Sequence, residues 1–283
     1  EQSGSTTIIL WPGQSRLITD SQIQEYSKKG AILLKKVFNI GWISLLAEGI
    51  EKNRKDPGPY ACQYTPKDKK GDFYDDYCNW QRIPEYQEFL FNSPAAKIVG
   101  QLTQSRRIRL FHEHILVKEP GTSEKTPWHH DQPYYCVDGE QVGSIWLPLD
   151  PVPREHGLEF ISGSHIWGKM FMPKKFLTHE EYDYKPKSFD PIPDIETNRD
   201  QYEILSWDLE PGDCIVFHFK TLHAGAGNLQ QSNRRRAFSS RWLGDDTVFA
   251  ERPGKTSPPF PELTFKQGDS MIHSLFPICW ENH

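Results

Sequence analysis

Helical periodicity in the first third of the chain and short strands in the rest predict an α+β fold whose core is a β-sandwich or β-barrel. Apolar residues recur three or four positions apart between residues 21 and 104, and from residue 107 short alternating or apolar runs follow one another. No linker divides the 283 residues. We therefore expect a single domain over residues 1–283, with a helical part at about 15–105 and a β core at about 106–250.

The helical part is expected to contain two pairs of helices. Residues 21–54 carry a helical repeat that breaks at residues 30–34, an apolar run that predicts a short strand between two helices. Asn39 lies where the second of these helices begins, and asparagine is a preferred N-cap residue. A second pair is expected at about residues 84–91 and 93–104, each with a proline at its start.

The β core is predicted from short strands that are separated by turn residues. Glu-Pro-Gly at residues 119–121, Ser-Gly-Ser at 162–164 and Glu-Pro-Gly-Asp at 210–213 are turn sequences. Residues 169–200 interrupt this rhythm with charged and proline-rich sequence, so we expect a long surface insertion there that closes over a substrate. The strands are expected at residues 107–117, 143–149, 158–161, 202–207, 214–219 and 236–243.

The composition excludes several classes of function. The 33 basic and 38 acidic residues give a net charge of −5, which does not favour binding to nucleic acid or to an anionic membrane surface. No apolar run is long enough to span a bilayer, and residues 1–5 lack the basic and apolar regions of a signal peptide. The five cysteines are scattered without metal-binding spacing, so we expect a reducing, cytoplasmic location.

The stretch at residues 127–132 (PWHHDQ) suggests a metal site. If it is a β-strand, the side chains of His129 and Asp131 project on one face and His130 points to the other. An imidazole and a carboxylate on one face provide two of the three ligands in the 2-His-1-carboxylate triad that holds non-haem Fe(II). The same spacing also arises by chance, because a histidine near an aspartate is often a surface pair or a satisfied core group.

A third ligand and an anion-binding residue are expected from the second half of the chain. The turn at residues 211–213 feeds a buried strand that would deliver His218 or His223 into the core. Arg235 follows in the next strand, and its guanidinium group suits a bidentate clamp on a carboxylate. The alternative for the arginine run 234–236 is a solvated segment or a nucleic-acid patch, which the acidic net charge and the strand-like sequence after it disfavour.

Together these stretches resemble the phytanoyl-CoA dioxygenase family of Fe(II)/2-oxoglutarate oxygenases, over about residues 118–246. Several blocks in the same order carry the likeness, which is more specific than any one block. PWHHDQ is similar to the family's P-W-H-x-D, and GLEFISGSH (157–165) to its N-G-x-L-x-x-x-P-G-S-H block. The other matching blocks are residues 144–150 (SIWLPLD), 212–228 and 235–237 (RRA).

The resemblance implies a double-stranded β-helix, the jelly-roll or cupin-like core, flanked by N-terminal helices. By position, it implies that Fe(II) is bound by His129, Asp131 and His223. The implied activity is a dioxygenase reaction that uses O2 and 2-oxoglutarate and hydroxylates a small-molecule substrate, with release of succinate and CO2. Related halogenases have glycine or alanine in place of the aspartate, so Asp131 argues against halogenation.

The resemblance also assigns residues to the cosubstrate. Arg235 would hold the far carboxylate of 2-oxoglutarate, and Trp146 and His114 occupy positions that contact this molecule. His218 falls on a family histidine that is not a metal ligand.

The chain departs from the family pattern at three places. His130 stands where glutamine is common, which would add a second donor near the iron. Gly225 replaces a frequent serine and removes one expected hydroxyl contact to 2-oxoglutarate. The spacing from His223 to the RRA block is one residue longer than usual, which leaves Arg234 as a rival to Arg235.

The sequence leaves the substrate, the oligomeric state and two other functions open. Candidates for a substrate wall are Trp80, Tyr134, Tyr135 and Trp167, each of which is equally suited to ordinary packing. The same three ligands could hold zinc in a metal hydrolase, or a structural metal in a non-catalytic jelly-roll protein. Neither alternative needs a carboxylate clamp close to the metal, so Arg235 favours the oxygenase.

Overall fold

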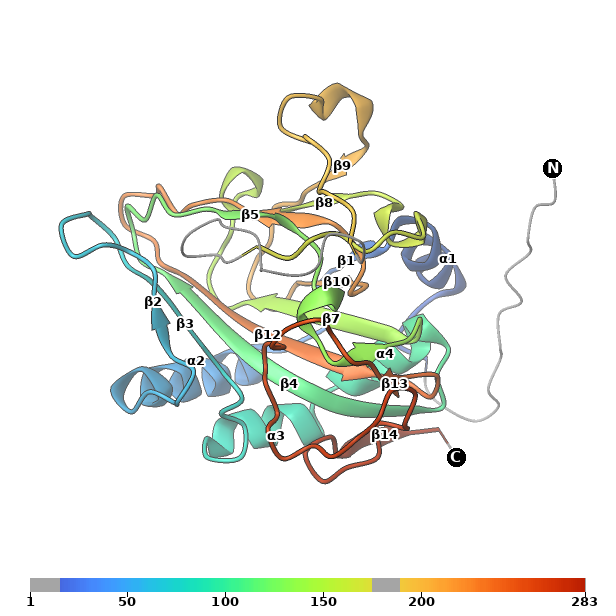
Figure 1. Ribbon diagram of the computed structural model, residues 1–283. Helices are drawn as coiled ribbons and strands as arrows, with labels where there is room; N and C mark the ends of the chain where they lie inside the picture. Colours follow the sequence, from blue (N-terminus) through green and yellow to red (C-terminus); the bar gives the residue numbers. More distant parts are fainter. Residues whose placement is uncertain (1–15, 175–188, 283) are drawn as a thin grey trace.

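Two antiparallel β-sheets that face each other form the centre of the computed structural model, which describes residues 16–174 and 189–282 (Figure 1). Apolar side chains from both sheets meet in one cluster, for example Phe217 of the larger sheet and Phe160 of the smaller, with ring centroids 5.1 Å apart. Such a sandwich of antiparallel strands is the predicted jelly-roll core.

The larger sheet has eight strands and carries the longest ones. Its order is β1 (Ala31–Leu34), β10 (Cys214–Phe217), β7 (Val142–Pro148), β12 (Arg235–Leu243), β4 (Arg107–Lys118), β3 (Phe73–Tyr77) and β2 (Cys62–Gln63), with β14 (Ile278–Glu281) also paired to β4.

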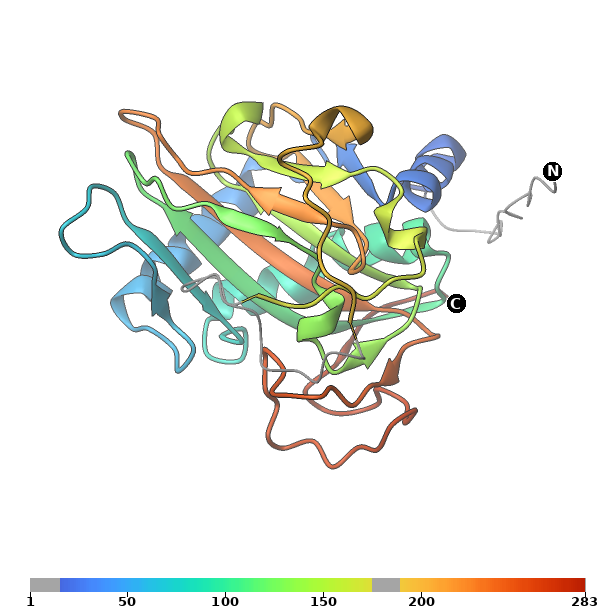
Figure 2. The same ribbon diagram turned by 45° about the horizontal axis from the view of Figure 1, so that its top comes forward.

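The smaller sheet has four short strands. Its order is β5 (Thr126–His129), β11 (His223–Gly225), β8 (Leu158–Ile161) and β9 (Ile204–Leu205), and a separate pair is formed by β6 (Val137–Asp138) and β13 (Val248–Phe249). Figure 2 shows the smaller sheet in front of the larger one, with α2 behind.

The helices lie against the outer face of the larger sheet. They are α1 (Asp20–Lys29), α2 (Ile40–Lys55), α3 (Pro84–Asn92) and α4 (Ala95–Thr103). The predicted cap of α2 is confirmed, because the side-chain oxygen of Asn39 accepts a hydrogen bond from the backbone N–H of Trp42 at 3.2 Å. No helix in the described ranges combines the length and the apolarity that crossing a bilayer requires.

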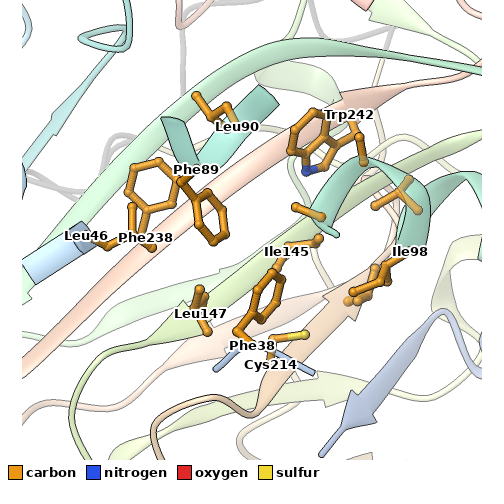
Figure 3. Packing of buried hydrophobic residues seen from close by; sticks show 14 of the residues in the cluster. Phe38, Leu46, Phe89, Leu90, Ile98, Ile145, Leu147, Cys214, Phe238 and Trp242 are labelled. Atoms are coloured by element: carbon orange, nitrogen blue, oxygen red, sulfur yellow. The ribbon is translucent and has the colours of Figure 1, made fainter. Parts of the chain in front are cut away.

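Alternation along the central strands decides which side chains face the helices and which face the smaller sheet. On β12, Phe238 and Trp242 pack beneath the helices, as Figure 3 shows, whereas Ala237 belongs to the cluster between the sheets. Arg235, Ser239 and Arg241 share the face of Ala237. The sequence of β12 therefore directs two arginines into the space between the sheets.

The predicted strands of the core are all present, with bounds that shift by a few residues. The strand β3 was not predicted, because its sequence FYDDY contains two aspartates, which are rare in strands. Both are buried and hydrogen-bonded. Asp75 pairs with His114 at 2.8 Å, and Asp76 accepts from the side-chain amide of Asn53 at 2.7 Å.

The predicted insertion is described only at its edges. The backbone N–H of Phe171 donates to His130 at 2.9 Å, and the hydroxyl of Tyr134 donates to the carbonyl of Lys174 at 2.7 Å. Residues 175–188 lie outside the described residues, so the closing of this segment over a substrate stays a prediction.

Glu113 on β4 is a buried acid on the helix side of the larger sheet. One carboxylate oxygen accepts a hydrogen bond from the backbone N–H of Asn79, and the other has no partner among the described residues. Burial raises the pKa of Glu113 from 4.5 to about 8, and the backbone hydrogen bonds oppose this only in part. The folded state therefore holds the proton more tightly than the unfolded chain, so the free energy of unfolding should fall as the pH rises from 4.5 to about 8.

We expect Glu113→Gln to remove this pH dependence, because the amide oxygen still accepts from Asn79 but the side chain cannot ionise. The variant should be more stable than the natural protein by about 5 kcal/mol at pH 9, and should differ from it by less than about 1 kcal/mol at pH 5. Urea denaturation at both pH values measures the difference. If the free energies of unfolding of the two proteins changed with pH in the same way, the ionisation of Glu113 would not destabilise the folded state.

Candidate metal centre and its cavity

The smaller sheet brings two histidines together. β11 begins at His223 and β5 ends at His129, and the antiparallel register places these two residues directly opposite each other. Their ring centroids are 4.2 Å apart. Two residues far apart in the chain thus present imidazoles side by side on the inner face of this sheet.

Asp131 reaches the same place by a route that differs from the prediction. β5 ends at His129, and Asp131 has helical backbone angles (φ −75°, ψ −34°) just before a short 3-10 turn, so the expected strand through Asp131 is wrong. Its backbone N–H donates to the carbonyl of Phe219 at 2.8 Å, which fixes the turn. The carboxylate still lies 3.5 Å from His129 Nε2 and 3.6 Å from His223 Nε2.

Hydrogen bonds to the backbone orient both imidazoles. Nδ1 of His129 lies 2.8 Å from the carbonyl of Pro127, and Nδ1 of His223 lies 2.9 Å from the carbonyl of Thr221. A carbonyl can only accept, so each Nδ1 carries the proton and each Nε2 keeps its lone pair for a ligand. Burial, aided by the neighbouring His129, lowers the pKa of His223 to about 3.

The charge of Asp131 is balanced within the protein. Burial alone would raise the pKa of Asp131, but His223, His129 and Arg241 outweigh it and hold the pKa below its usual range. Arg241 Nη2 lies 4.0 Å from the carboxylate, and the hydroxyl of Ser144 lies 3.5 Å from it. The carboxylate is therefore ionised and available to a cation.

The donor set fits a divalent first-row metal. One ligand atom from each of His129, Asp131 and His223 lies within 4.8 Å of the others, and all three residues are buried. Within residues 16–174 and 189–282, this is the one such cluster of histidine, cysteine and acidic side chains. Two imidazole nitrogens and one carboxylate on one side leave the opposite positions of the metal open.

His130 and His218 lie outside the cluster. Nε2 of His130 accepts from the N–H of Phe171, and Nδ1 donates to the carbonyl of Lys220 at 3.2 Å, so the expected second donor near the iron is turned away. Nδ1 of His218 accepts from the N–H of Lys220 at 3.1 Å, and Nε2 donates to the carbonyl of Glu140 at 3.2 Å. The structure thus brings His223, and not His218, to the cluster.

A cavity between the two sheets opens beside the three residues. The cavity and its open mouth together hold about 740 Å3 that no protein atom fills. Of the residues expected at the site, Trp146, His114, Tyr134 and Tyr135 line it.

Two aromatic residues expected at the substrate wall lie elsewhere. Trp80 packs on Phe91, with ring centroids 5.7 Å apart, against the helix-side core. Trp167 is 36% exposed and lies near Phe171 and Tyr202 at the surface. Aromatic residue type alone did not separate packing from cavity positions.

The three consecutive arginines have different surroundings. Arg234 forms ion pairs with Glu119 at 2.6 Å and Glu51 at 2.9 Å, and Arg236 pairs with Asp150 at 2.8 Å. Arg235 is 5% exposed and donates to the carbonyl of His156. Among the described residues no carboxylate pairs with Arg235, and burial lowers its pKa to about 10, so it stays cationic near neutral pH.

Six polar cavity residues were not predicted: Tyr77, His112, Thr126, Ser239, Arg241 and Ser257. Nε of Arg241 donates to the hydroxyl of Tyr135 at 3.0 Å. Nδ1 of His112 and the hydroxyl of Ser239 have no partner among the described residues. Three of them could have been predicted from the alternation of side chains along a strand. His112 lies two positions before His114 on β4, and Ser239 and Arg241 lie two and four positions after Ala237 on β12.

Comparisons with known proteins match this chain to one family. The family described as phytanoyl-CoA dioxygenase (PhyH) matches residues 26–237. The chain is 28% identical over 157 residues to 1-deoxypentalenic acid 11-beta-hydroxylase of Streptomyces arenae, which covers 55% of this chain and 51% of that protein. It is 23% identical over 152 residues to phytanoyl-CoA dioxygenase 1 of Oryza sativa subsp. japonica, and the match covers 53% of this chain and 50% of that protein. The chain spans about half the length of the curated relatives it matches.

Solved structures confirm the fold over most of the chain. SnoK, a non-haem alpha-ketoglutarate-dependent carbocyclase from nogalamycin biosynthesis, superposes with a TM-score of 0.71 at 18% identity and covers 93% of this chain and 96% of its own. EctD from S. alaskensis, solved with 2-oxoglutarate and 5-hydroxyectoine, superposes with a TM-score of 0.60 at 17% identity. The superposition covers 89% of this chain and 85% of EctD.

Proposed function

The chain belongs to the phytanoyl-CoA dioxygenase family, and from this premise we propose that it is a non-haem Fe(II)/2-oxoglutarate-dependent dioxygenase that hydroxylates a small molecule. The observation that carries the proposal is the pairing of a buried His-Asp-His cluster with a buried arginine that has no carboxylate partner among the described residues. A metal that is chelated by a dicarboxylic cosubstrate requires both features.

The residues have separate tasks in this proposal. His129, Asp131 and His223 hold Fe(II) through Nε2, a carboxylate oxygen and Nε2, and their backbone hydrogen bonds keep these atoms in place. Arg235 binds the far carboxylate of 2-oxoglutarate, and Trp146 borders the cosubstrate. When bound, Fe(II) and 2-oxoglutarate supply the oxidising chemistry with O2, and succinate and CO2 are the products.

The surroundings of Arg235 disfavour a hydrolase and a non-catalytic metal protein. Leaving a guanidinium group buried without an anion is costly, so the position is explained best by an anionic ligand. Zinc hydrolysis and structural metal binding need no such ligand. The ion pairs of Arg234 and Arg236 also support Arg235, and not Arg234, as the clamp.

The packing of the core and the state of the cysteines support two further parts of the proposal, a single domain and a reducing location. Helices and the larger sheet share one apolar cluster, from Ile43 and Phe89 to Ile145 and Trp242, so residues 1–283 are proposed to act as one oxygenase domain. All five cysteines are free, which suits a cytoplasmic location.

A succinate-release screen tests the proposal. The protein, loaded with Fe(II), is incubated with 2-oxoglutarate and O2 and with acyl-CoA thioesters, amino acids, alkylphosphonates or secondary metabolites. We expect one class to stimulate succinate release and to yield a product with one added oxygen atom, and His223→Ala to give neither. Hydrolysis of a substrate with zinc, without consumption of 2-oxoglutarate, would favour the hydrolase.

A further inference from the structure

Arg241 is a second buried arginine on the inner face of the larger sheet, and it lies far from Arg235. Six positions separate the two on β12, which corresponds to about 20 Å along the strand. Arg241 lines the cavity near Asp131 of the metal centre, whereas Arg235 lies at the start of β12. The inner face of β12 thus carries two separate guanidinium groups, and Arg241 is the one beside the metal centre.

The hydrogen bonds of Arg241 use only part of its guanidinium group. Nε donates to the hydroxyl of Tyr135 at 3.0 Å, and Nη1 donates to the carbonyl of Ser239 at 3.3 Å. A guanidinium group has five N–H groups, so three of those in Arg241 lack a partner within residues 16–174 and 189–282. The carboxylate of Asp131 lies 4.0 Å from Nη2, which is too far for a hydrogen bond. The edge formed by Nη1 and Nη2 is therefore available to a ligand.

Arg252 is an arginine of equal burial that has a complete set of partners. Its side chain is 7% exposed, against 8% for Arg241. It pairs with the carboxylate of Asp138 at 2.7 Å and donates to the carbonyls of Tyr135 at 2.8 Å and Val137 at 2.7 Å. Contacts within the protein therefore explain the burial of Arg252, whereas they leave the guanidinium group of Arg241 short of an anion.

His112 lies beside Arg241 and also lacks a partner. The two residues are paired in register across β4 and β12, so their side chains are neighbours on the cavity face. His112 is buried, and its Nδ1 has no hydrogen-bond partner in the part of the chain that the structure describes. Burial, together with Arg241 and His114, holds the pKa of His112 well below its usual range, so the imidazole is neutral and has one N–H to donate. A buried polar atom that faces a cavity without a partner indicates a place that a ligand completes.

Aromatic rings surround this pair and the metal centre. The ring centroid of His112 lies 5.2 Å from that of Tyr135 and 6.4 Å from that of Tyr77. The ring centroid of Tyr134 lies 6.0 Å from that of His129. All three tyrosines line the cavity, so they offer an apolar wall beside the N–H groups of Arg241 and His112.

We propose that Arg241 and His112 bind an anionic oxygen group of the substrate, a carboxylate or a phosphonate, and thereby select small organic acids. The apolar part of such an acid lies against the tyrosines of the cavity. The inference rests on the proposed function, because it places the substrate beside Fe(II) and 2-oxoglutarate. The rival anion at this place is the 1-carboxylate of 2-oxoglutarate itself.

Equilibrium binding of three probes to the protein loaded with Fe(II) and saturating 2-oxoglutarate, without O2, tests the proposal. The probes are phenylacetate, benzylphosphonate and phenylacetamide, which share an aromatic body and differ in the charge of the other end. We expect at least one of the two anions to bind about tenfold more tightly than the neutral amide in a calorimetric titration. The anion that binds more tightly identifies the group of the substrate as a carboxylate or as a phosphonate.

Matched variants identify the residues that bind the anion. Arg241→Lys keeps the charge but cannot form two parallel hydrogen bonds, so the dissociation constant of the anion should rise about tenfold, whereas Arg252→Lys should leave it unchanged. His112→Leu lacks the N–H group and should also lose about tenfold, whereas His112→Gln retains a donor and should stay within about threefold of the natural protein. The affinities for phenylacetamide and for Fe(II) should be kept in all four variants, which separates an anion contact from a general structural effect.

The outcomes distinguish this inference from the proposed function. If the natural protein binds no 2-oxoglutarate, the proposed function fails and the inference fails with it. If it binds 2-oxoglutarate but binds the amide as tightly as both anions, or binds none of the probes, the inference is wrong and the function stands. If Arg241→Lys weakened the binding of 2-oxoglutarate and not that of the anion, Arg241 would belong to the cosubstrate, and the inference would again be wrong.

Discussion

Replacing His129, Asp131 or His223 with alanine is expected to abolish Fe(II) binding and turnover while the fold is kept. Each residue provides one of three atoms that lie within 4.8 Å of one another, and Nδ1 of each histidine is already bonded to the backbone. Loss of a ligand should weaken Fe(II) binding by at least about a hundredfold, since loss of an outer hydrogen-bond partner alone costs about ten- to a hundredfold. Titration calorimetry without O2 measures the affinity, and circular dichroism checks the fold.

His218→Ala is the matched control, because His218 is a buried histidine on the same segment as His223. Both of its ring nitrogens are engaged with the backbone of Lys220 and Glu140. The variant should bind Fe(II) normally and lose only stability. Loss of iron in His218→Ala together with normal binding in His223→Ala would show that the distal ligand has been assigned to the wrong residue.

Arg235→Lys is expected to raise the Michaelis constant for 2-oxoglutarate about tenfold or more. A lysine keeps the charge but cannot form the two parallel hydrogen bonds of a guanidinium with a carboxylate, and a loss of roughly 1.5 kcal/mol corresponds to that factor. The Michaelis constant for the substrate should change much less. Steady-state kinetics with each compound varied in turn measures both.

Arg234→Lys and Arg236→Lys are the controls for this change. Both arginines pair with carboxylates of the protein, Glu119 and Asp150, and both side chains are more exposed than that of Arg235. Neither substitution should change the Michaelis constant for 2-oxoglutarate appreciably. A larger effect from Arg234→Lys than from Arg235→Lys would transfer the clamp to Arg234.

The order of helices and strands could be predicted from sequence because it depends on local patterns. The apolar run at β10 and the alternation of β4 and β12 show in the sequence, and the helix cap at Asn39 is a local signal. Arg235 was expected at the strand that follows His223, and it lies at the start of β12.

The turn at Asp131 and the strand β3 could not be predicted, because both depend on contacts between distant segments. Asp131 leaves the strand after His129 and is held by the carbonyl of Phe219. The aspartates of β3 are acceptable in a buried strand because other groups bind them, among them His114 and Asn53.

Thr126 lines the cavity beside His129, and a third reason explains why this position could not be predicted. Simple alternation predicts that Thr126 faces away from His129, and only a bulge in the pairing of β5 with β11 reverses it. Pattern-based prediction assumes a regular register, so it misses side chains that an irregular register directs into a site.

The visible absorption of the protein with Fe(II) and 2-oxoglutarate in the absence of O2 tests the central claim most directly. A keto acid that chelates iron held by His129, Asp131 and His223 should give a weak metal-to-ligand charge-transfer band, which saturates as 2-oxoglutarate is added. The band should be absent in His223→Ala and should need more 2-oxoglutarate in Arg235→Lys. A natural protein that binds Fe(II) but gives no band with 2-oxoglutarate would contradict the account.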